Sequence, residues 1–163
     1  MGLHTTLDDF DWAILALLQA DNLTPQREIA EQVNLSPAAV QRRIKRLQES
    51  GVIAANTAQL HPDAIGRPLT IFIEVQLVNE LDAMTTGFRA RILQEAAVQQ
   101  CYMVTGQTDY LLIVTATDMQ EYQALTQRLF GDDQNIQRFT TSIALGTLKR
   151  SLHLPIPGSS YQK

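Results

Sequence analysis

The chain has 163 residues, 45% of them hydrophobic, so it can bury the core of one medium-sized domain or of two small ones. Its formal net charge of −4 excludes a polycation that coats nucleic acid indiscriminately, and no apolar run reaches the roughly 18 residues that would span a membrane. The single cysteine, Cys101, excludes an intramolecular disulfide framework and fits a reducing cytoplasm.

Two helices are predicted in the first 33 residues, each with its own start signal. The first follows a candidate N-cap, Asp8, and its apolar side chains recur at helical spacing, namely Phe10, Ile14, Leu17 and Leu18. The second begins with Thr24 as its cap and Pro25 as its first helical residue, and its buried stripe is Ile29, Ala30 and Val33. Asn34 follows at a point where a left-handed backbone is useful, and asparagine tolerates that conformation.

A third helix is predicted to start at Ser36 and Pro37, which repeat the signal of a cap followed by proline, and to end near Ser50, before Gly51. Residues 52–60 look extended and are expected to form a short wing or a lead-in strand. Residues 61–68 are rich in turn formers and are interpreted as a linker between a domain at 1–60 and another at 69–155. Residues 156–163 are expected to form a loose tail.

The second domain alternates between strand and helix periods. Strands are expected at 69–78, 100–105, 110–116 and 136–148, and the continuously apolar 110–116 suits a central position. One helix is expected at 82–97, with Phe88, Ile92 and Leu93 on one side, and a second after its cap Asp118, bearing Met119, Tyr122, Leu125 and Leu129. The βαββαβ order predicts an α+β chain whose ferredoxin-like second domain has both helices on one face of the sheet. A second copy of the chain is expected to cover the other face.

The predicted third helix has the pattern of a DNA-reading helix. Val40, Ile44 and Leu47 fall on one stripe, and four cations fall away from it, so residues 36–50 carry a net charge of +3 on an otherwise acidic protein. Small residues stand at the N-terminal end, where base edges are approached, and the cations behind them can reach phosphates. DNA contacts are therefore expected from Ser36, Pro37, Ala38, Ala39, Gln41, Arg42, Arg43, Lys45 and Arg46.

The alternative for this helix is a solvated basic face, which charge runs usually form. The spacing of Ala30, Asn34 and Val40 favours DNA binding, because it lets two helices cross closely. Alanine permits the contact, asparagine makes the turn and valine anchors the second helix.

Two stretches resemble the Lrp/AsnC, or feast/famine, transcription regulators. Residues 35–53, LSPAAVQRRIKRLQESGVI, look like that family's signature, and Leu7-Asp8 with Asp11 and Ile14-Leu15 is similar to its first helix. The resemblance extends over residues 7–155. It implies a winged helix-turn-helix followed by an amino-acid-sensing α+β domain, and homodimers that assemble further, to an octamer.

Residues 104–112, VTGQTDYLL, match the G-x-x-D-Y loop of the same family, whose effector lies between neighbouring dimers against this loop and the last strand. Gly106 lets the backbone approach a ligand, amide groups of a turn can hold a carboxylate, and Asp109 can accept from an ammonium group. The alternative is a plain β-turn in which Asp109 bonds its own backbone. The resemblance implies an amino-acid site formed by Val104, Gly106, Gln107, Thr108, Asp109, Tyr110, Thr140, Thr141 and Ser142.

No metal or cofactor is expected, because His4, His61 and His153 lie far apart and there is no second cysteine. Siroheme decarboxylase subunits are similar to this family in overall fold, but their His-Asn-Tyr-x-Arg motif has no counterpart in residues 100–104, QCYMV. A nucleoid-type architectural protein, which binds many DNA sites with little preference, stays open as an alternative. The sequence favours a cytoplasmic, nucleoid-associated regulator that binds double-stranded DNA and an amino acid, rather than an enzyme or a membrane protein.

Overall fold

The computed structural model describes residues 6–79 and 81–157, and the chain divides into two compact units. One unit holds the chain up to Ala58 together with the chain from Arg150 on, and the other is Gln59–Lys149. The segment 61–68, predicted as a linker, belongs to the second unit. Residues 150–155, predicted with the sheet, belong to the first, where the Gln19 side chain and the Leu154 backbone exchange two hydrogen bonds. Of the predicted tail at 156–163, only the first two residues lie in the described part.

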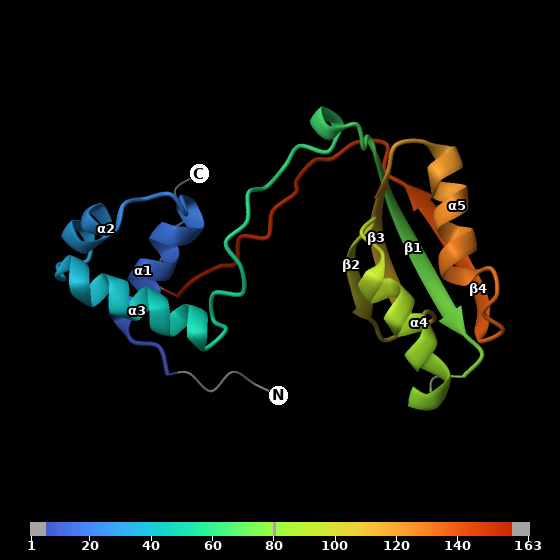
Figure 1. The fold of residues 1–163 in the computed structure, drawn as a ribbon, viewed down its shortest axis with the longest axis horizontal. Helices are drawn as coiled ribbons and strands as arrows, with labels where there is room; N and C mark the ends of the chain where they lie inside the picture. The colour runs from blue at the N-terminus through green and yellow to red at the C-terminus, as the bar shows by residue number, and fades with distance from the viewer. Residues whose placement is uncertain (1–5, 80, 158–163) are drawn as a thin grey trace. The chain divides into compact units, whose positions relative to one another are not determined.

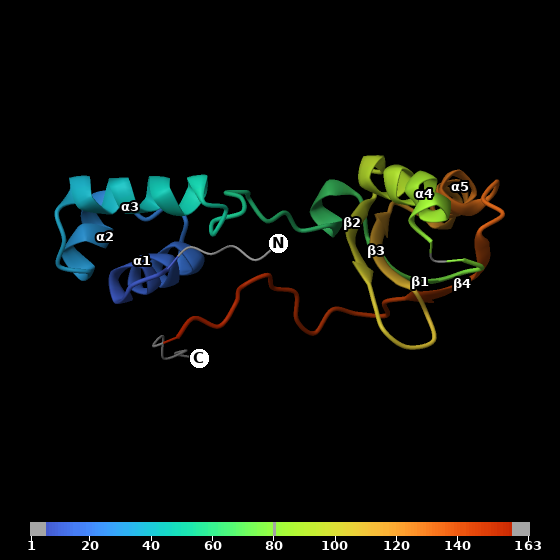
Figure 2. The ribbon, with the colours of Figure 1, turned by 90° about the horizontal axis from the view of Figure 1, so that it is seen from below.

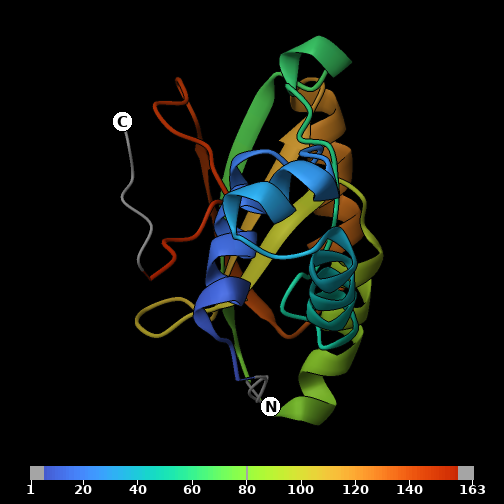
Figure 3. The ribbon, with the colours of Figure 1, turned by 90° about the vertical axis from the view of Figure 1, so that its left-hand side faces the viewer.

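Three helices form the first unit: α1 (Asp9–Ala20), α2 (Gln26–Gln32) and α3 (Pro37–Glu49) (Figure 1). They cross one another rather than run parallel (Figure 3), and they enclose a small apolar cluster. Ile14, Ile29 and Val40, one from each helix, have no exposed surface, which confirms the predicted buried stripes. Phe10 is an exception, with 42% of its surface exposed, because it lies beside Arg43 rather than in the cluster.

Local capping signals set the helix starts. The Asp8 carboxylate accepts from the Asp11 amide and the Asp11 carboxylate accepts from the Asp8 amide, so α1 begins with a reciprocal capping box. The Ser36 hydroxyl accepts from the Ala39 amide and caps α3, as predicted. Asn34 has a φ of 54°, the left-handed conformation expected at its position.

Two predictions for the first unit are wrong. Pro25, not Thr24, is the N-cap of α2, because the Thr24 hydroxyl donates to the carbonyl of Asp21 instead. Residues 52–60 do not form a strand in the described chain. Ile53 packs against the apolar cluster, and the small and polar residues after it have no neighbouring strand to pair with.

The second unit is an antiparallel sheet with two helices. After a turn of 3-10 helix at Asp63–Ile65 come β1 (Leu69–Leu77), α4 (Asp82–Gln94), β2 (Val98–Met103), β3 (Tyr110–Ala116), α5 (Met119–Phe130) and β4 (Ile136–Ile143). The strands lie in the order β2-β3-β1-β4, and all neighbours are antiparallel. This arrangement confirms the predicted ferredoxin-like topology and the central position of β3.

Three predicted boundaries in this unit shift because tertiary packing sets them. Helix α4 ends at Gln94 rather than at residue 97, and Leu93, predicted on its buried side, is 87% exposed. Strand β2 consequently begins earlier, at Val98. Strand β4 ends at Ile143 rather than at residue 148, because β1 has almost no residues left with which to pair.

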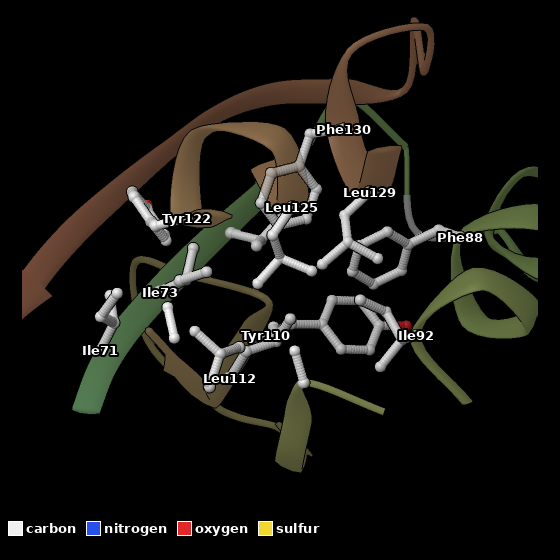
Figure 4. Close-up of a cluster of buried hydrophobic side chains, with 14 of the residues drawn as sticks. Ile71, Ile73, Phe88, Ile92, Tyr110, Leu112, Tyr122, Leu125, Leu129 and Phe130 are labelled. Atoms are coloured by element: carbon white, nitrogen blue, oxygen red, sulfur yellow. The ribbon is translucent and has the colours of Figure 1, made fainter. Parts of the chain in front are cut away.

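Both helices lie on one face of the sheet (Figure 2), and the main core fills the space between helices and strands (Figure 4). Alternate strand residues such as Ile73 and Leu112 point into this core and have no exposed surface. Phe88 from α4 and Leu125 from α5 pack against them. None of the helices among the described residues is long and apolar enough to cross a membrane.

The opposite face of the sheet has no helix of the second unit on it (Figure 2). Register and alternation place on this open face Phe72, Glu74, Gln76, Leu111, Ile113, Arg138, Thr140 and Ser142. In β1 and β4, Glu74 lies opposite Thr140 and Gln76 lies opposite Arg138. The open face therefore combines an apolar part with a polar, charged part.

Candidate DNA-binding and effector sites

The outward face of α3 presents polar and small side chains opposite a buried stripe. Val40 and Leu47 have no exposed surface and Ile44 has 9%, so one side of the helix is fixed in the core of the first unit. The exposed residues include most of the predicted DNA contacts: Ser36, Pro37, Ala38, Gln41, Arg42, Lys45 and Arg46. Ala39 and Arg43 are half-buried.

Two of the four cations of α3 are paired with acidic residues of the first helix and its cap. The Asp11 carboxylate, which has no exposed surface, accepts from Arg43 at 2.8 Å and from Arg46. Arg43 also donates to both carboxylate oxygens of Asp8, at 2.8 and 2.9 Å, and its guanidinium lies 5.3 Å from the ring centroid of Phe10. The expectation that all four cations share the outward face therefore does not hold for Arg43, which reaches across to α1.

Asp8 and Arg43 both have pKa values shifted so that the charged form is favoured. The Asp11 backbone amide, and after it the Arg43 guanidinium, hold the pKa of Asp8 below its usual value. The Asp11 and Asp8 carboxylates raise the pKa of Arg43. Asp8 and Asp11 thus offset two of the four positive charges of α3.

The other two cations, Arg42 and Lys45, are more available to bind an external anion. Arg42 has no ion-pair partner among the described residues, and Lys45 has only an exposed contact of 3.7 Å with Glu49. A hollow of about 330 Å³ borders this side of α3 and is lined by Leu35, Ala39, Arg42, Arg43 and Arg46. Arg42, the one of its three arginines that is not paired with Asp8 or Asp11, makes it a favourable place for an anion such as a backbone phosphate.

The loop between β2 and β3 is held to β1 by side-chain contacts. Asp109 accepts from the Leu77 amide at 2.6 Å through its carboxylate, and its own amide donates to the Val75 carbonyl. The Thr108 hydroxyl donates to the same carbonyl at 2.8 Å. Gly106, at the tip, has a φ of 123°, and a Cβ added there would meet nothing within 4 Å. The Asp109 carboxylate therefore bonds backbone, as the β-turn alternative expected, but the backbone of β1 rather than that of its own turn.

A polar hollow of about 240 Å³ lies between this loop and the open face. It is lined by Glu74, Gln76, Gln107, Thr108, Arg138 and Thr140. Three of these residues, Gln107, Thr108 and Thr140, belong to the predicted effector site. Within the hollow an exposed carboxylate, Glu74, and a guanidinium, Arg138, provide opposite charges.

Sequence reasoning missed Glu74, Gln76 and Arg138. The first two stand two residues apart within a mostly apolar strand, and that alternation is a signal for polar groups on one face of a sheet. Arg138 has no such signal, because only the strand register brings its Nε within 2.9 Å of the Gln76 side-chain oxygen.

The structure does not bring every predicted effector residue to the hollow. Tyr110 is 4% exposed in the core, where its ring packs against Phe88 and its hydroxyl accepts from Arg89. Thr141 turns toward α5 and is hydrogen-bonded to the Tyr122 hydroxyl. Successive strand residues point to opposite faces, so Thr140, Thr141 and Ser142 cannot all face one site. Val104, Gly106 and Asp109 lie in the loop that borders the hollow without lining it.

Among the residues that the structure describes, no three histidine, cysteine, aspartate or glutamate side chains gather as a metal site would require. His4, one of the three histidines, lies outside the described residues.

Two family models match the two units. The model of a winged helix-turn-helix DNA-binding domain matches residues 7–54, and the model of the Lrp/AsnC ligand-binding domain matches residues 70–154. The first match covers all three helices of the first unit, and the second covers the sheet, apart from its first residue Leu69, with its two helices.

Relatives of known class match over nearly the full chain. An uncharacterised HTH-type transcriptional regulator of Sinorhizobium fredii is 39% identical over 92% of this chain and 89% of its own length. The DNA-binding transcriptional activator DecR of Escherichia coli is 31% identical over 92% of this chain and 99% of its own. A transcriptional regulator of Neisseria meningitidis, solved in complex with L-methionine, superposes with a TM-score of 0.83 at 31% identity, over 92% of this chain and 97% of that one. The chain belongs to the Lrp/AsnC family of helix-turn-helix transcription regulators.

Proposed function

We propose that this helix-turn-helix regulator reads its operator with the outward face of α3, and that an amino acid bound in the second unit modulates it. The observation that carries the DNA-binding part is the split of α3 into a buried apolar stripe and an exposed basic side. Small residues at the start of the helix, Pro37 and Ala38, allow close approach to base edges, and Gln41 follows them one turn later. Arg42 and Lys45 are placed to contact phosphates.

For the effector, the polar hollow suits a small zwitterion. Glu74 can accept from the ligand ammonium group and Arg138 can donate to its carboxylate, each in a charge-assisted hydrogen bond. Gln107, Thr108 and Thr140 offer further polar contacts to the ligand side chain. The L-methionine complex of the meningococcal relative supports an amino acid as the class of ligand.

The regulator is proposed to work as a homodimer that assembles further, as an octamer, on the nucleoid of the cytoplasm. The open face of the sheet includes Phe72, which is 36% exposed, next to Ile113 of the neighbouring strand. The apolar part of this face is a favourable surface to bury, and a second copy can cover it with the same surface by twofold symmetry. Two recognition helices in one dimer would contact two half-sites of the operator.

The relatives give no support to the alternatives of an architectural protein or an enzyme, since those named above are transcription regulators. Specificity is the property that separates a regulator from an architectural protein. It is measured by comparing the affinity for an operator, selected by the wild-type protein from genomic fragments, with that for a random duplex at the same salt concentration.

The Gln41→Ala variant tests the assignment of α3. A lost base contact lowers the operator affinity about tenfold or more and leaves the affinity for random DNA nearly unchanged. Lys45→Ala lowers both affinities together, because a phosphate contact carries no sequence information. Gln123→Ala, an exposed glutamine of α5, is the control and leaves both affinities unchanged. If Gln41→Ala distinguished the operator from random DNA as well as the wild type does, Gln41 would not be a base-contacting residue.

The effector site is tested by calorimetric titration of the twenty amino acids. At least one is expected to bind to the wild type, and Arg138→Gln is expected to weaken that binding about tenfold or more, because it removes the charge opposite the ligand carboxylate. Arg128→Gln makes the same change on an exposed part of α5 and keeps wild-type affinity. Unaltered binding by Arg138→Gln would place the amino acid elsewhere, and no binding to the wild type would contradict amino-acid sensing.

A further inference from the structure

We propose that the four cations of α3 perform two different tasks. Two of them, Arg43 and Arg46, are positioning residues that hold α3 against α1. The other two, Arg42 and Lys45, carry the positive charge that DNA meets. The proposal rests on DNA reading by α3, and it separates the residues that contact DNA from those that orient the helix. The positioning group, called here the ion-pair cluster, consists of Asp8, Asp11, Arg43 and Arg46.

Asp11 is the centre of the ion-pair cluster. It is fully buried, and its two oxygens accept from Arg43, from Arg46 and from the Asp8 amide. A buried carboxylate without such partners is strongly disfavoured, so the fold keeps both guanidinium groups beside it. Because Asp11 also belongs to the capping box of α1, the start of α1 and the middle of α3 are joined at one point.

Arg43 joins the two acidic residues to each other. One terminal nitrogen of its guanidinium lies within 2.9 Å of oxygens of both Asp8 and Asp11, while the guanidinium lies over the ring of Phe10. All of these partners belong to the start of α1 and its cap, so a rotation of α3 about its own axis would break several contacts at once. The buried stripe turns one side of α3 toward the core, and the ion-pair cluster holds α3 in that orientation against α1.

The ion-pair cluster also limits the attraction of α3 for any DNA. The negative charges of Asp8 and Asp11 lie between 2.8 and 2.9 Å from Arg43 and in contact with Arg46, so they reduce the positive potential at these two cations. Non-specific binding depends on the number of phosphates that a protein neutralises. We expect Arg42 and Lys45 to neutralise most of the phosphates that α3 contacts, because no carboxylate of α1 contacts either residue in the described chain.

The test measures the affinity for a random-sequence duplex over a series of salt concentrations, together with the thermal unfolding midpoint. Arg42→Ala is expected to reduce the slope of log affinity against log salt by about 0.9 for each recognition helix, with an unchanged midpoint. Arg43→Ala is expected to lower the midpoint by several degrees and to change the slope by less than half as much. Arg27→Ala, which removes an exposed cation of α2, is the control for general charge effects on stability.

Asp8→Asn is the second variant, and its effect on DNA affinity can be interpreted without a change in the stability of the fold. Asparagine caps a helix about as well as aspartate, so the midpoint should change little. Removal of the charge beside Arg43 should raise the affinity for random DNA about two- to fivefold and make the salt slope steeper. Asp21→Asn changes an exposed aspartate of the same unit and should have a smaller effect.

The outcomes separate this proposal from the proposed function. The division of tasks would be wrong if Arg43→Ala reduced the salt slope as much as Arg42→Ala does. It would also be wrong if Asp8→Asn and Asp21→Asn had equal effects on the affinity for random DNA. DNA binding itself would stand in both cases. Absence of DNA binding by the wild-type protein would overturn the proposed function and the division with it. If Arg43→Ala does not fold, Asp8→Asn decides the question, because its midpoint is expected to stay near that of the wild type.

Discussion

Among single residues, Arg67 and Glu121 show how one ion pair joins segments that are distant in sequence. Arg67, just before β1, donates to the Thr115 carbonyl at 2.7 Å and to Glu121 of α5 at 2.8 Å. The Glu121 carboxylate also accepts from the Thr117 amide at 2.6 Å. The Thr117 amide, followed by the Arg67 guanidinium, lowers the pKa of Glu121 from 4.5 to about 2. Folding therefore favours the charged form of this carboxyl.

This shift predicts an acid-sensitive contribution to stability. The folded-state pKa of Glu121 lies below the unfolded-state value, so its contribution is present above about pH 4.5 and is lost as the pH falls toward 2. Because the side chain is 31% exposed, solvent screening reduces the effect, and Glu121→Gln should cost about 1–2 kcal/mol at neutral pH. Chemical unfolding at pH 7 and at pH 3 measures the difference, which should shrink at the lower pH. Glu31→Gln, 68% exposed, is the control, and a loss that is independent of pH would contradict the assignment.

At the scale of helices and strands, the first residue of an element could be predicted where a local cap sets it. The last residue could not be predicted where tertiary packing sets it. Ser36 and Asp118 cap α3 and α5 as their sequence neighbours indicate, since a cap acts over three residues. The end of β4 depends on how much of β1 remains to be paired, and the exposure of Leu93 depends on where α4 leaves the sheet. Neither quantity is local.

The two sites differ in the same way. The exposed side of α3 follows from helical periodicity, so the sequence could place Gln41 and Arg42 on that side of the helix. The partners of Arg43 lie 32 and 35 residues away and could not. In the polar hollow, register brings Arg138 to Gln76, while alternation sends Thr141 to the core. Long-range pairing thus decides which members of a motif act together.

For the whole molecule, we propose that the covering of the open face decides the state of assembly. Phe72 and Ile113 are direct neighbours on β1 and β3, on the face without a helix. Such a face exposes apolar surface that a dimer would bury, and a dimer would also place two copies of α3 on one operator. We therefore expect assembly and DNA affinity to be linked through this surface.

The Ile113→Glu variant tests that link, because a carboxylate on the open face would lose hydration on dimerisation without a partner to replace it. The variant is expected to sediment as a monomer at concentrations where the wild type is a dimer or larger. Its operator affinity should fall at least tenfold, because a single recognition helix contacts only one half-site. Leu93→Glu makes a similar change at a position of α4 that is 87% exposed, and it should leave mass and affinity unchanged. Equal masses for Ile113→Glu and the wild type in analytical ultracentrifugation would show that copies of the chain meet through another surface.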